Sequence, residues 1–447
     1  MTSITTSWDI IKSELSNLEL ITDPIQLTKL SLDYYHFSPI LTDKLQDKRG
    51  ELVVRPSNEA EVIQVAQTCV KYKIPLTVRG AGTGNYGQCI PLKGGIILDM
   101  SKMNQIYSIE PGTACVEPGV KMAAFDKKAR EIGWELRMAP STYRTATIGG
   151  FIGGGSGGMG SVTYGQLRDR GNLQSVRVVS VEDEPRVIEL RGDEVQQVNH
   201  AYGTNGIITQ LEIPLAPAYP WAEIIVTFDD FMTAAKFGQA LSDSDGIVKK
   251  LVSIHAAPIC RYFHALKEHL REGKHGALLM VSEYDLKAFD DLVNQYQGEV
   301  TYLKTPQEAS HGSSLLEFTW NHTTLHARSI DHTLTYLQTF YFTLENVEHF
   351  YHHFGDEVMI HLEFFQVNGK AIPGGLQLVR FTTEARLNEI IEYHEKKGAG
   401  IANPHTFILE DGGRKVIEPE QLAFKKLVDP YGLMNPGKMR SWEQVVG

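Results

Sequence analysis

The sequence has few cysteines, no excess of positive charge and no long hydrophobic run, and each absence excludes a class of protein. The cysteines are far apart and form no CxxC pair, so we expect buried free thiols rather than disulfides or metal ligands, and a reducing, cytoplasmic setting. They are Cys69, Cys89, Cys115 and Cys260. The formal net charge is −11 and no segment is rich in lysine and arginine, which argues against a nucleic-acid partner. No apolar run approaches the roughly 18 residues of a membrane span, and the start, MTSITTSWDIIKSEL, does not resemble a signal peptide.

The common nucleotide and zinc motifs are also missing. Neither the P-loop pattern GxxxxGK[ST] nor HExxH occurs. Residues 82–87 (GTGNYG) satisfy GxGxxG, but Pro91 and Gly94-Gly95 interrupt the chain and a strand is predicted from Ile96. No room remains for the helix that a Rossmann unit requires, so this fold is excluded.

What the sequence does have is glycine, concentrated in two segments. Residues 149–160 (GGFIGGGSGGMG) contain eight glycines, and an earlier loop runs from Arg79 to Gly87. Glycine lets a ligand approach the backbone closely, and successive N–H groups in such loops bind anions. The pair of loops indicates a dinucleotide; the alternative is a pair of tight turns between packed elements.

The apolar pattern predicts an α+β protein with short elements. Short helices are expected over 7–19 and 24–33, and a longer helix is expected to begin after a cap at Ser57 or Asn58. Strands are predicted at 76–78, 96–99, 175–181 and 207–213. After Tyr219 glycine becomes rarer, and aromatic residues and histidines become frequent. We therefore expect a helical lead-in (1–46), a ligand-binding domain (47–218), a second α+β domain (219–420) and a tail (421–447) that returns to the first domain.

Seven segments, in order, resemble the FAD-binding domain of the vanillyl-alcohol oxidase / p-cresol methylhydroxylase (PCMH) family. They are VVRP, IPLTVRGAGTGNYGQ, IILDMSKMNQI, VEPGV, APSTYRTATIGGFIGGGSGG, AYGTNGIITQLEIPL and DPYGLMNPGK. The tail is most similar to the branch of glycolate oxidase flavin subunits and D-lactate dehydrogenases. The resemblance implies a PCMH-type FAD-binding domain of two α/β subdomains, and a substrate (cap) domain with an antiparallel sheet.

The same resemblance implies which residues hold FAD. The first loop would bind the pyrophosphate, the second segment the flavin and ribityl chain, a third stretch the adenine or ribityl part, and the tail the isoalloxazine edge. The implied residues are Arg79, Gly80, Gly82, Thr83, Gly84, Asn85, Pro140, Ser141, Thr147, Gly149, Gly150, Ser156, Gly157, Gly203, Gly206, Ile208, Asn435 and Lys438. Some relatives attach the flavin covalently through His or Cys; Thr83 stands at the usual His position and 141–144 contain no Cys, so we expect non-covalent FAD.

Candidate catalytic groups lie in the second domain. His322 and His326 are four apart and would share a helix face near Arg328, whose guanidinium suits a carboxylate. His361 and Glu363 alternate along a predicted strand.

A polar turn adds His405 and Glu410, which we interpret as a base and its orienting partner. For each group the alternative is a structural role, as a packed or hydrogen-bonded side chain. The metal-associated motifs HxGDGNxH and EHGIG of the hydroxy-acid branch are degraded, with Asp411 in place of a His, so no metal is expected.

These observations predict an FAD-linked oxidase or dehydrogenase that transfers a hydride from a small alcohol or hydroxy acid to the flavin. The electron acceptor would be oxygen or a redox partner, and a partner subunit is possible. Two alternatives remain open: a flavin-binding electron-transfer or scaffold subunit, and a reductase similar to the NADPH-dependent UDP-N-acetylenolpyruvylglucosamine reductases.

Overall fold

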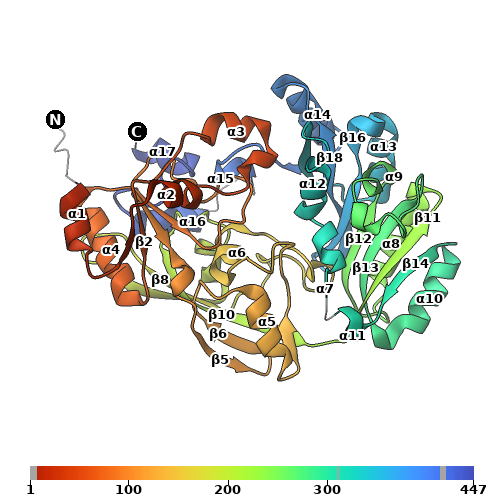
Figure 1. The fold of residues 1–447 in the computed structure, drawn as a ribbon, viewed down its shortest axis with the longest axis horizontal. Coiled ribbons are helices and arrows are strands. Elements are labelled where there is room, and N and C mark those ends of the chain that lie inside the picture. Colours follow the sequence, from red (N-terminus) through yellow and green to blue (C-terminus); the bar gives the residue numbers. More distant parts are fainter. Residues whose placement is uncertain (1–7, 310–311, 413–418, 447) are drawn as a thin grey trace.

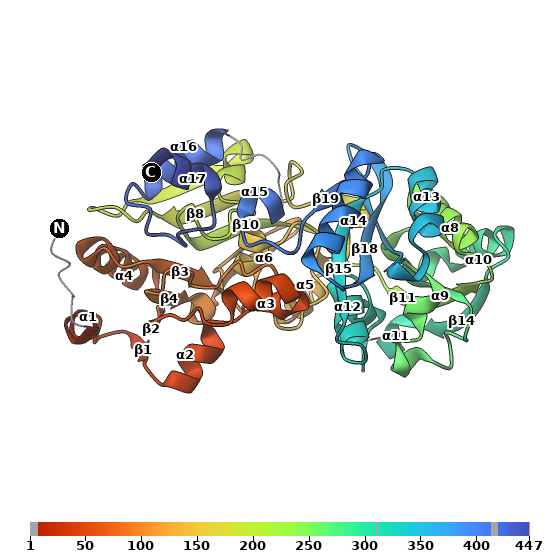
Figure 2. The same ribbon diagram turned by 90° about the horizontal axis from the view of Figure 1, so that it is seen from above.

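The computed structural model describes residues 8–309, 312–412 and 419–446, and in this part of the chain the strands form three sheets. Figure 1 shows two lobes side by side. The first lobe contains the two N-terminal sheets together with α16 (Pro419–Val428) and α17 (Arg440–Val446), and the second lobe contains the third sheet. The first and last helices therefore belong to the same lobe (Figure 2).

The first sheet has the strand order β1-β2-β4-β3, in which β2, β4 and β3 are parallel and β1 is antiparallel. Helix α4 begins after Asn58, whose side chain accepts a hydrogen bond from Glu61 N, and packs Val62, Val65 and Val70 in the core of this sheet. The bounds are α1 (Trp8–Glu14), β1 (Glu19–Ile21), α2 (Pro24–Leu30), α3 (Pro39–Leu45), β2 (Leu52–Arg55), α4 (Glu59–Tyr72), β3 (Leu76–Arg79) and β4 (Ile96–Asp99). The first two helices are shorter than expected, and residue 7 lies outside the described residues.

The second sheet is antiparallel, with the order β5-β6-β10-β8-β9 and β7 paired to β10. Its long central strand β10 continues past Pro214, where the sequence predicted an end. The bounds are β5 (Ile106–Glu110), β6 (Thr113–Val116), α5 (Met122–Arg130), β7 (Trp134–Leu136), α6 (Ile148–Gly154), α7 (Ser161–Tyr164), β8 (Ser175–Val179), β9 (Val187–Arg191) and β10 (Ile207–Pro217).

The glycine-rich segment 149–160 is not a single loop, because its first part forms helix α6. Thr147 caps this helix: its Oγ1 accepts a hydrogen bond from Gly150 N at 3.2 Å. Glycine disfavours helices, which is why the sequence predicted a loop. Burial of Ile148, Phe151 and Ile152 in the core of the second sheet outweighs that preference.

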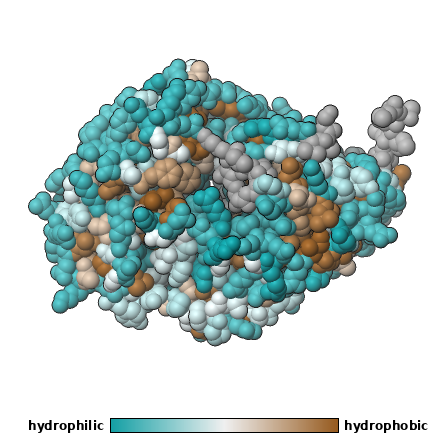
Figure 3. Space-filling view, turned by 180° about the vertical axis from the view of Figure 1, so that it is seen from behind, coloured by the Kyte–Doolittle hydropathy of each residue, from teal (hydrophilic) through white to brown (hydrophobic). Residues whose placement is uncertain are grey.

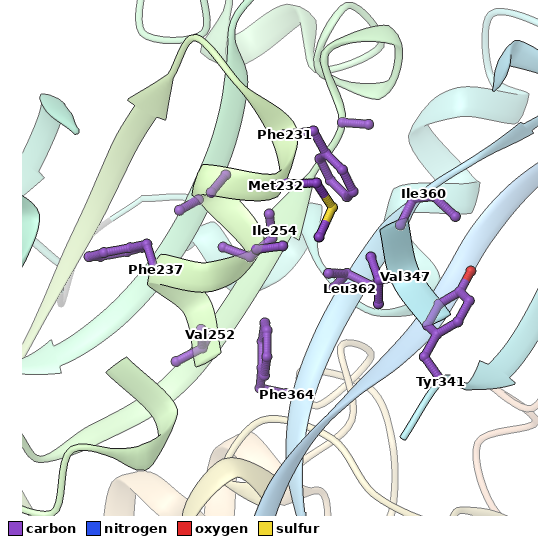
Figure 4. Packing of buried hydrophobic residues seen from close by; sticks show 14 of the residues in the cluster. Phe231, Met232, Phe237, Val252, Ile254, Tyr341, Val347, Ile360, Leu362 and Phe364 are labelled. Carbon is purple, nitrogen blue, oxygen red and sulfur yellow. The ribbon is translucent and has the colours of Figure 1, made fainter. Parts of the chain in front are cut away.

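The third sheet is antiparallel, as the resemblance implied, with the order β14-β11-β13-β12-β17-β18-β15-β19 and β16 paired to β18. Helices α8, α10, α13 and α14 cover one face, where Met232 of α8 points toward Leu362 of β17 (Figure 4). Phe237 of α8 points away from β17 and packs against Phe228 and Phe289. The other face carries α9 and α12.

The bounds in the rest of the chain are β11 (Trp221–Phe228), α8 (Phe231–Asp243), β12 (Lys249–His255), α9 (Ala257–Cys260), β13 (His275–Ser282), α10 (Leu286–Gln295), β14 (Glu299–Lys304), α11 (Pro306–Ala309), α12 (Asn321–Arg328), β15 (Leu334–Phe340), α13 (Leu344–Phe354), β16 (Val358–Met359), β17 (His361–Val367), β18 (Lys370–Arg380), α14 (Glu384–Lys396), β19 (Gly400–Ala402) and α15 (Leu409–Gly412).

The face of the molecule in Figure 3 is mostly hydrophilic, with hydrophobic residues in separate patches. Among the helices of the described chain, none has both the length and the apolar character to cross a membrane.

Candidate active site

A cavity of about 610 Å³ lies between the two lobes. The first lobe contributes the glycine loop that follows β3, helix α6 and the stretch around Tyr202. The second lobe contributes residues of α12 and β15, among them His322 and Gln338. A ligand in this cavity would therefore contact both lobes at once.

An N-terminal segment, residues 30–38, ties the two sides of the cavity together. Tyr34 N donates to Gly84 O at 2.7 Å, on the glycine loop of the first lobe. Thr335 Oγ1, on β15 of the second lobe, donates to Phe37 O at 2.7 Å. Tyr34 and Phe37 themselves line the cavity. The segment thus fixes the spacing between glycine loop and third sheet.

Most of the residues predicted to hold FAD line this cavity. They are Arg79, Gly80, Gly82, Thr83, Gly84, Asn85, Pro140, Ser141, Thr147, Gly149, Gly150, Ser156, Gly157, Gly203, Gly206 and Ile208. Their individual contacts to the cofactor stay predictions.

The glycines of the cavity wall fit a ligand that approaches the backbone. A Cβ added at Gly153 would meet no protein atom within 4 Å, and one at Gly154 would have its nearest atom, Gln88 Nε2, at 3.7 Å. Protein packing therefore does not require glycine at these two positions. Gly203 and Gly206 instead have φ values of +67° and +85°, which residues other than glycine rarely adopt. Open space beside a glycine backbone is what a bound dinucleotide needs.

Arg79 holds the glycine loop in place through hydrogen bonds to backbone carbonyls. Its guanidinium donates to the carbonyls of Leu30, Leu32 and Ala81, at 3.1 Å for Leu32 and 3.2 Å for Ala81. These bonds join the glycine loop to the N-terminal segment. The positive charge stays next to the loop, although its donors are engaged with the protein.

Asn435 and Lys438 do not line the cavity, contrary to the expectation that they reach the isoalloxazine edge. The tail pairs beside β3 through Leu76 and Met434, which places both side chains behind the cavity wall. Asn435 Nδ2 donates to Gln88 O at 2.7 Å and to Tyr202 O at 2.6 Å, and Lys438 Nζ donates to Gly87 O. Burial lowers the pKa of Lys438, opposed by the charge of Asp33. Both residues hold the wall from outside.

His361 and Glu363 share one face of β17, as the alternation predicts, but His361 does not line the main cavity. His361 Nε2 lies 2.9 Å from Glu363 Oε1, and its Nδ1 lies 3.2 Å from Leu376 O. The His361 ring also stacks on His255, with 4.2 Å between centroids. His361 is therefore fully engaged inside the second lobe.

The expected pairing of His405 with Glu410 does not form. His405 Nε2 donates to Tyr336 O at 2.9 Å, and the Ser38 hydroxyl donates to Nδ1 at 2.8 Å, which fixes the neutral tautomer. Glu410 instead accepts backbone hydrogen bonds from Arg440 and Ser441. The two side chains therefore have different partners, and neither residue lines the cavity.

Arg328 does not lie at the cavity either. Its guanidinium donates to the carbonyls of His332 and Leu334, after the end of α12. These bonds close the turn from α12 to β15. The expected clamp of Arg328 on a substrate carboxylate stays a prediction.

Some of the second-lobe residues that line the cavity were predicted from the sequence, and others were not. His322 and His326 lie on α12, the helix on which the four-residue spacing depended, and both line the cavity. Burial, reinforced by His326, lowers the pKa of His322 to about 4, so the ring is neutral at neutral pH. Trp320, Gln338 and Phe340 were not predicted, because no local motif marks them.

All four cysteines are free, and Cys89 is the one that lines the cavity. Burial raises the pKa of its thiol to about 11. A thiol that stays protonated is a poor nucleophile. In the part of the chain that the structure describes, no three His, Cys, Asp or Glu residues are grouped so that they could hold a metal ion.

Residues 50–187 match the family model described as an FAD binding domain. Glycolate oxidase subunit GlcD of Escherichia coli (strain K12) is 27% identical over 212 residues, which cover 45% of this chain and 41% of that protein. D-lactate dehydrogenase of Anaerostipes hadrus is 31% identical over 182 residues, which cover 38% of this chain and 37% of that protein. This chain thus aligns with about two fifths of the length of these curated relatives.

Solved structures share the fold over the whole chain. An alkyldihydroxyacetonephosphate synthase superimposes with a TM-score of 0.70 at 16% identity, covering 98% of this chain and 86% of that one. A 4-ethylphenol oxidase from Gulosibacter chungangensis gives 0.68 at 15% identity, covering 98% of each chain. At this identity the likeness concerns the fold alone.

The matched domain and the shared fold define an FAD-binding flavoprotein. Residues 50–187 match the FAD binding domain that the ordered motifs predicted, and the curated proteins to which the chain is similar include a glycolate oxidase subunit and a D-lactate dehydrogenase.

Proposed function

We propose that this protein is an FAD-dependent oxidoreductase that removes a hydride from the CH–OH group of a small alcohol or hydroxy acid. The observation that carries the proposal is the cavity of about 610 Å³, which has glycine backbone on one side and imidazole, indole and amide side chains on the other. The first side suits a dinucleotide, and the second suits a small polar substrate.

In this proposal the first lobe holds FAD through the backbone of the two glycine segments. Bound FAD supplies the two-electron acceptor for the hydride. The thiol of Cys89 is protonated and Thr83 has no nucleophilic ring nitrogen, which supports non-covalent binding.

The second lobe would position the substrate and receive its hydroxyl proton. His322 lines the cavity as a neutral imidazole, the form that accepts a proton. Trp320 and Phe340 provide apolar surfaces that exclude water, and Gln338 provides an amide. His322 is therefore a better candidate for the base than His361 or His405, which lie away from the cavity.

The test begins with the visible spectrum of the purified protein, repeated on the supernatant after acid precipitation. Flavin bands that move to the supernatant are expected for non-covalent FAD. Anaerobic bleaching by a panel of alcohols and hydroxy acids would then establish the oxidoreductase. No flavin after reconstitution with FAD would contradict the proposal.

The same experiment separates the alternatives. A flavin that NADPH bleaches would favour the reductase reading, and one reduced only by another redox protein would favour an electron-transfer or scaffold subunit. Returning oxygen to the bleached protein distinguishes an oxidase from a dehydrogenase that needs a redox partner. We infer a cytoplasmic location and a possible partner subunit from the sequence alone.

A further inference from the structure

A small recess of about 20 Å³ lies beside the main cavity. Trp320, Gln338, Phe340 and Leu376 line both spaces, so the two share a wall. The recess has room for one group of the size of a water molecule. Ser156, Gly157, Ser161 and Gln166 of the first lobe complete its lining, so the recess lies where the two lobes meet.

Glu363 supplies the charge at this recess. The residue is 1% exposed, and its Oε1 accepts hydrogen bonds from Ser253 Oγ at 2.8 Å and Trp320 N at 2.7 Å, besides its contact with His361. Its second oxygen, Oε2, is buried and has no hydrogen-bond partner among the described residues. A buried carboxylate oxygen without a partner is costly, so this atom requires a donor.

Another polar atom of a residue that lines the recess lacks a partner in the described chain. It is the indole Nε1 of Trp320, which can only donate. Together with Glu363 Oε2, it matches a group that both donates and accepts. A hydroxyl does both, a carboxylate only accepts, and an ammonium only donates.

The charges around the second-lobe side of the cavity also favour an uncharged group over a carboxylate. No lysine or arginine is found among the described residues that line it from that lobe, and Glu317 adds a further carboxylate. Arg144 lines the cavity from the first lobe, but its Nε pairs with Glu317 at 2.6 Å. Arg168, the other first-lobe arginine apart from Arg79, is exposed. A substrate carboxylate placed against the second lobe would face Glu363, and the described lining residues of that lobe include no lysine or arginine to compensate it.

We propose that the Glu363 recess binds a hydroxyl group of an uncharged substrate and selects against carboxylates. The inference rests on the proposed function and narrows its substrate class: a neutral alcohol with a hydroxyl for the recess, rather than a 2-hydroxy acid. Glu363 Oε2 receives the hydrogen bond of that hydroxyl, Trp320 Nε1 donates to its oxygen, and Glu363 is the specificity-determining residue.

The test compares matched pairs in which only the charge differs: ethylene glycol with glycolate, 1,2-propanediol with lactate, and glycerol with glycerate. Binding to the FAD-loaded protein is measured by calorimetry and by the difference spectrum of the flavin. The neutral member of at least one pair is expected to bind on the order of tenfold more tightly than its carboxylate. Calorimetry reads binding even if no compound reduces the flavin, so failure of the proposed function is distinguishable from failure of this inference.

Glu363→Gln keeps the shape and an oxygen for Ser253, but presents an N–H to the recess in place of an acceptor. We expect it to abolish the preference for the neutral member while FAD content is retained. Glu389→Gln is the matched control, because this carboxyl is exposed and pairs with Arg386 on the surface. If Glu363→Gln does not fold, Trp320→Phe removes the second partner and should weaken the neutral ligand alone.

Three results would overturn the proposal. The first is tighter binding of the carboxylate in every pair, and the second is no binding of any neutral member. The third is an unchanged preference in both Glu363→Gln and Trp320→Phe, which would mean that the recess holds an ordered water only.

Discussion

At the scale of single residues, the glycines of the cavity have two different origins. A Cβ at Gly149 would lie 2.4 Å from Pro118 Cβ, and one at Gly155 would lie 2.5 Å from Phe151 Cδ2, so protein packing explains these two. Gly153 has no protein neighbour there. We infer that a ligand occupies this space, and the two origins predict different mutant behaviour.

Gly153→Leu should therefore yield folded protein that has lost most of its FAD. The helix tolerates leucine better than glycine by about 1 kcal/mol, so the loss would come from the occupied cavity. The ratio of flavin to protein absorbance, measured with the circular dichroism spectrum, checks this.

Gly246→Leu is the matched control, since its Cβ also meets nothing within 4 Å but the residue lies in an exposed turn away from the cavity. Full FAD occupancy in Gly153→Leu would show that the cofactor does not pass this residue. Gly82→Val is a less selective probe, because its Cβ would lie 1.9 Å from the Arg79 guanidinium at a φ of +66°.

His405→Ala should destabilise the protein by about 2 kcal/mol, because it leaves Tyr336 O without its ring donor and Ser38 without its acceptor. The folded variant should still reduce its flavin at the normal rate. Urea unfolding and anaerobic bleaching measure the two effects. A normal stability with a lost rate would restore His405 to the catalytic role that the sequence suggested.

The residues that could be predicted from the sequence are those whose position is set locally. Gly80 to Asn85 follow directly from β3, so their place at the cavity depends on a short turn. His361 and Glu363 were assigned to one strand face correctly, but whether that face meets the cavity depends on β12 and β18, far away in sequence. Trp320 and Gln338 reach the cavity through tertiary packing alone, which no local pattern encodes.

At the scale of elements, α6 is a helix of low intrinsic stability. Four of its seven residues are glycine, each costing roughly 1 kcal/mol relative to alanine in a helix interior. Thr147 is its cap and also lines the cavity. We therefore predict that helix formation and cofactor binding are coupled through this residue.

Thr147→Ala should weaken FAD binding about fivefold, the equivalent of the roughly 1 kcal/mol that an N-cap contributes. Thr147→Ser keeps the hydroxyl and should bind FAD normally. Titration of apoprotein with FAD, followed by quenching of the flavin fluorescence, gives both dissociation constants. Equal dissociation constants for the two variants would show that the N-cap hydroxyl does not contribute to FAD binding.

At the scale of the whole molecule, the buried histidines make stability depend on pH. Burial lowers the pKa of His394 and of His405 to about 4, whereas an unfolded histidine titrates near 6.5. Between these values the unfolded chain binds more protons than the folded one, so stability is lost as the pH falls.

The free energy of unfolding should therefore decrease from neutral pH to about pH 5, by up to about 1.4 kcal/mol per pH unit for each of these histidines. Urea unfolding at a series of pH values measures the slope. His405→Gln should have a smaller slope than the wild type, and an identical slope would contradict the assignment of this histidine.

The bonds of Asn435 to Gln88 and Tyr202 have a consequence for how the protein is made. During translation, the glycine loop and the stretch around Tyr202 are synthesised long before Asn435, which joins them. A nascent chain thus cannot complete this wall while it is being synthesised. Capture of the cofactor becomes a late event of biogenesis, which follows translation of nearly the whole polypeptide.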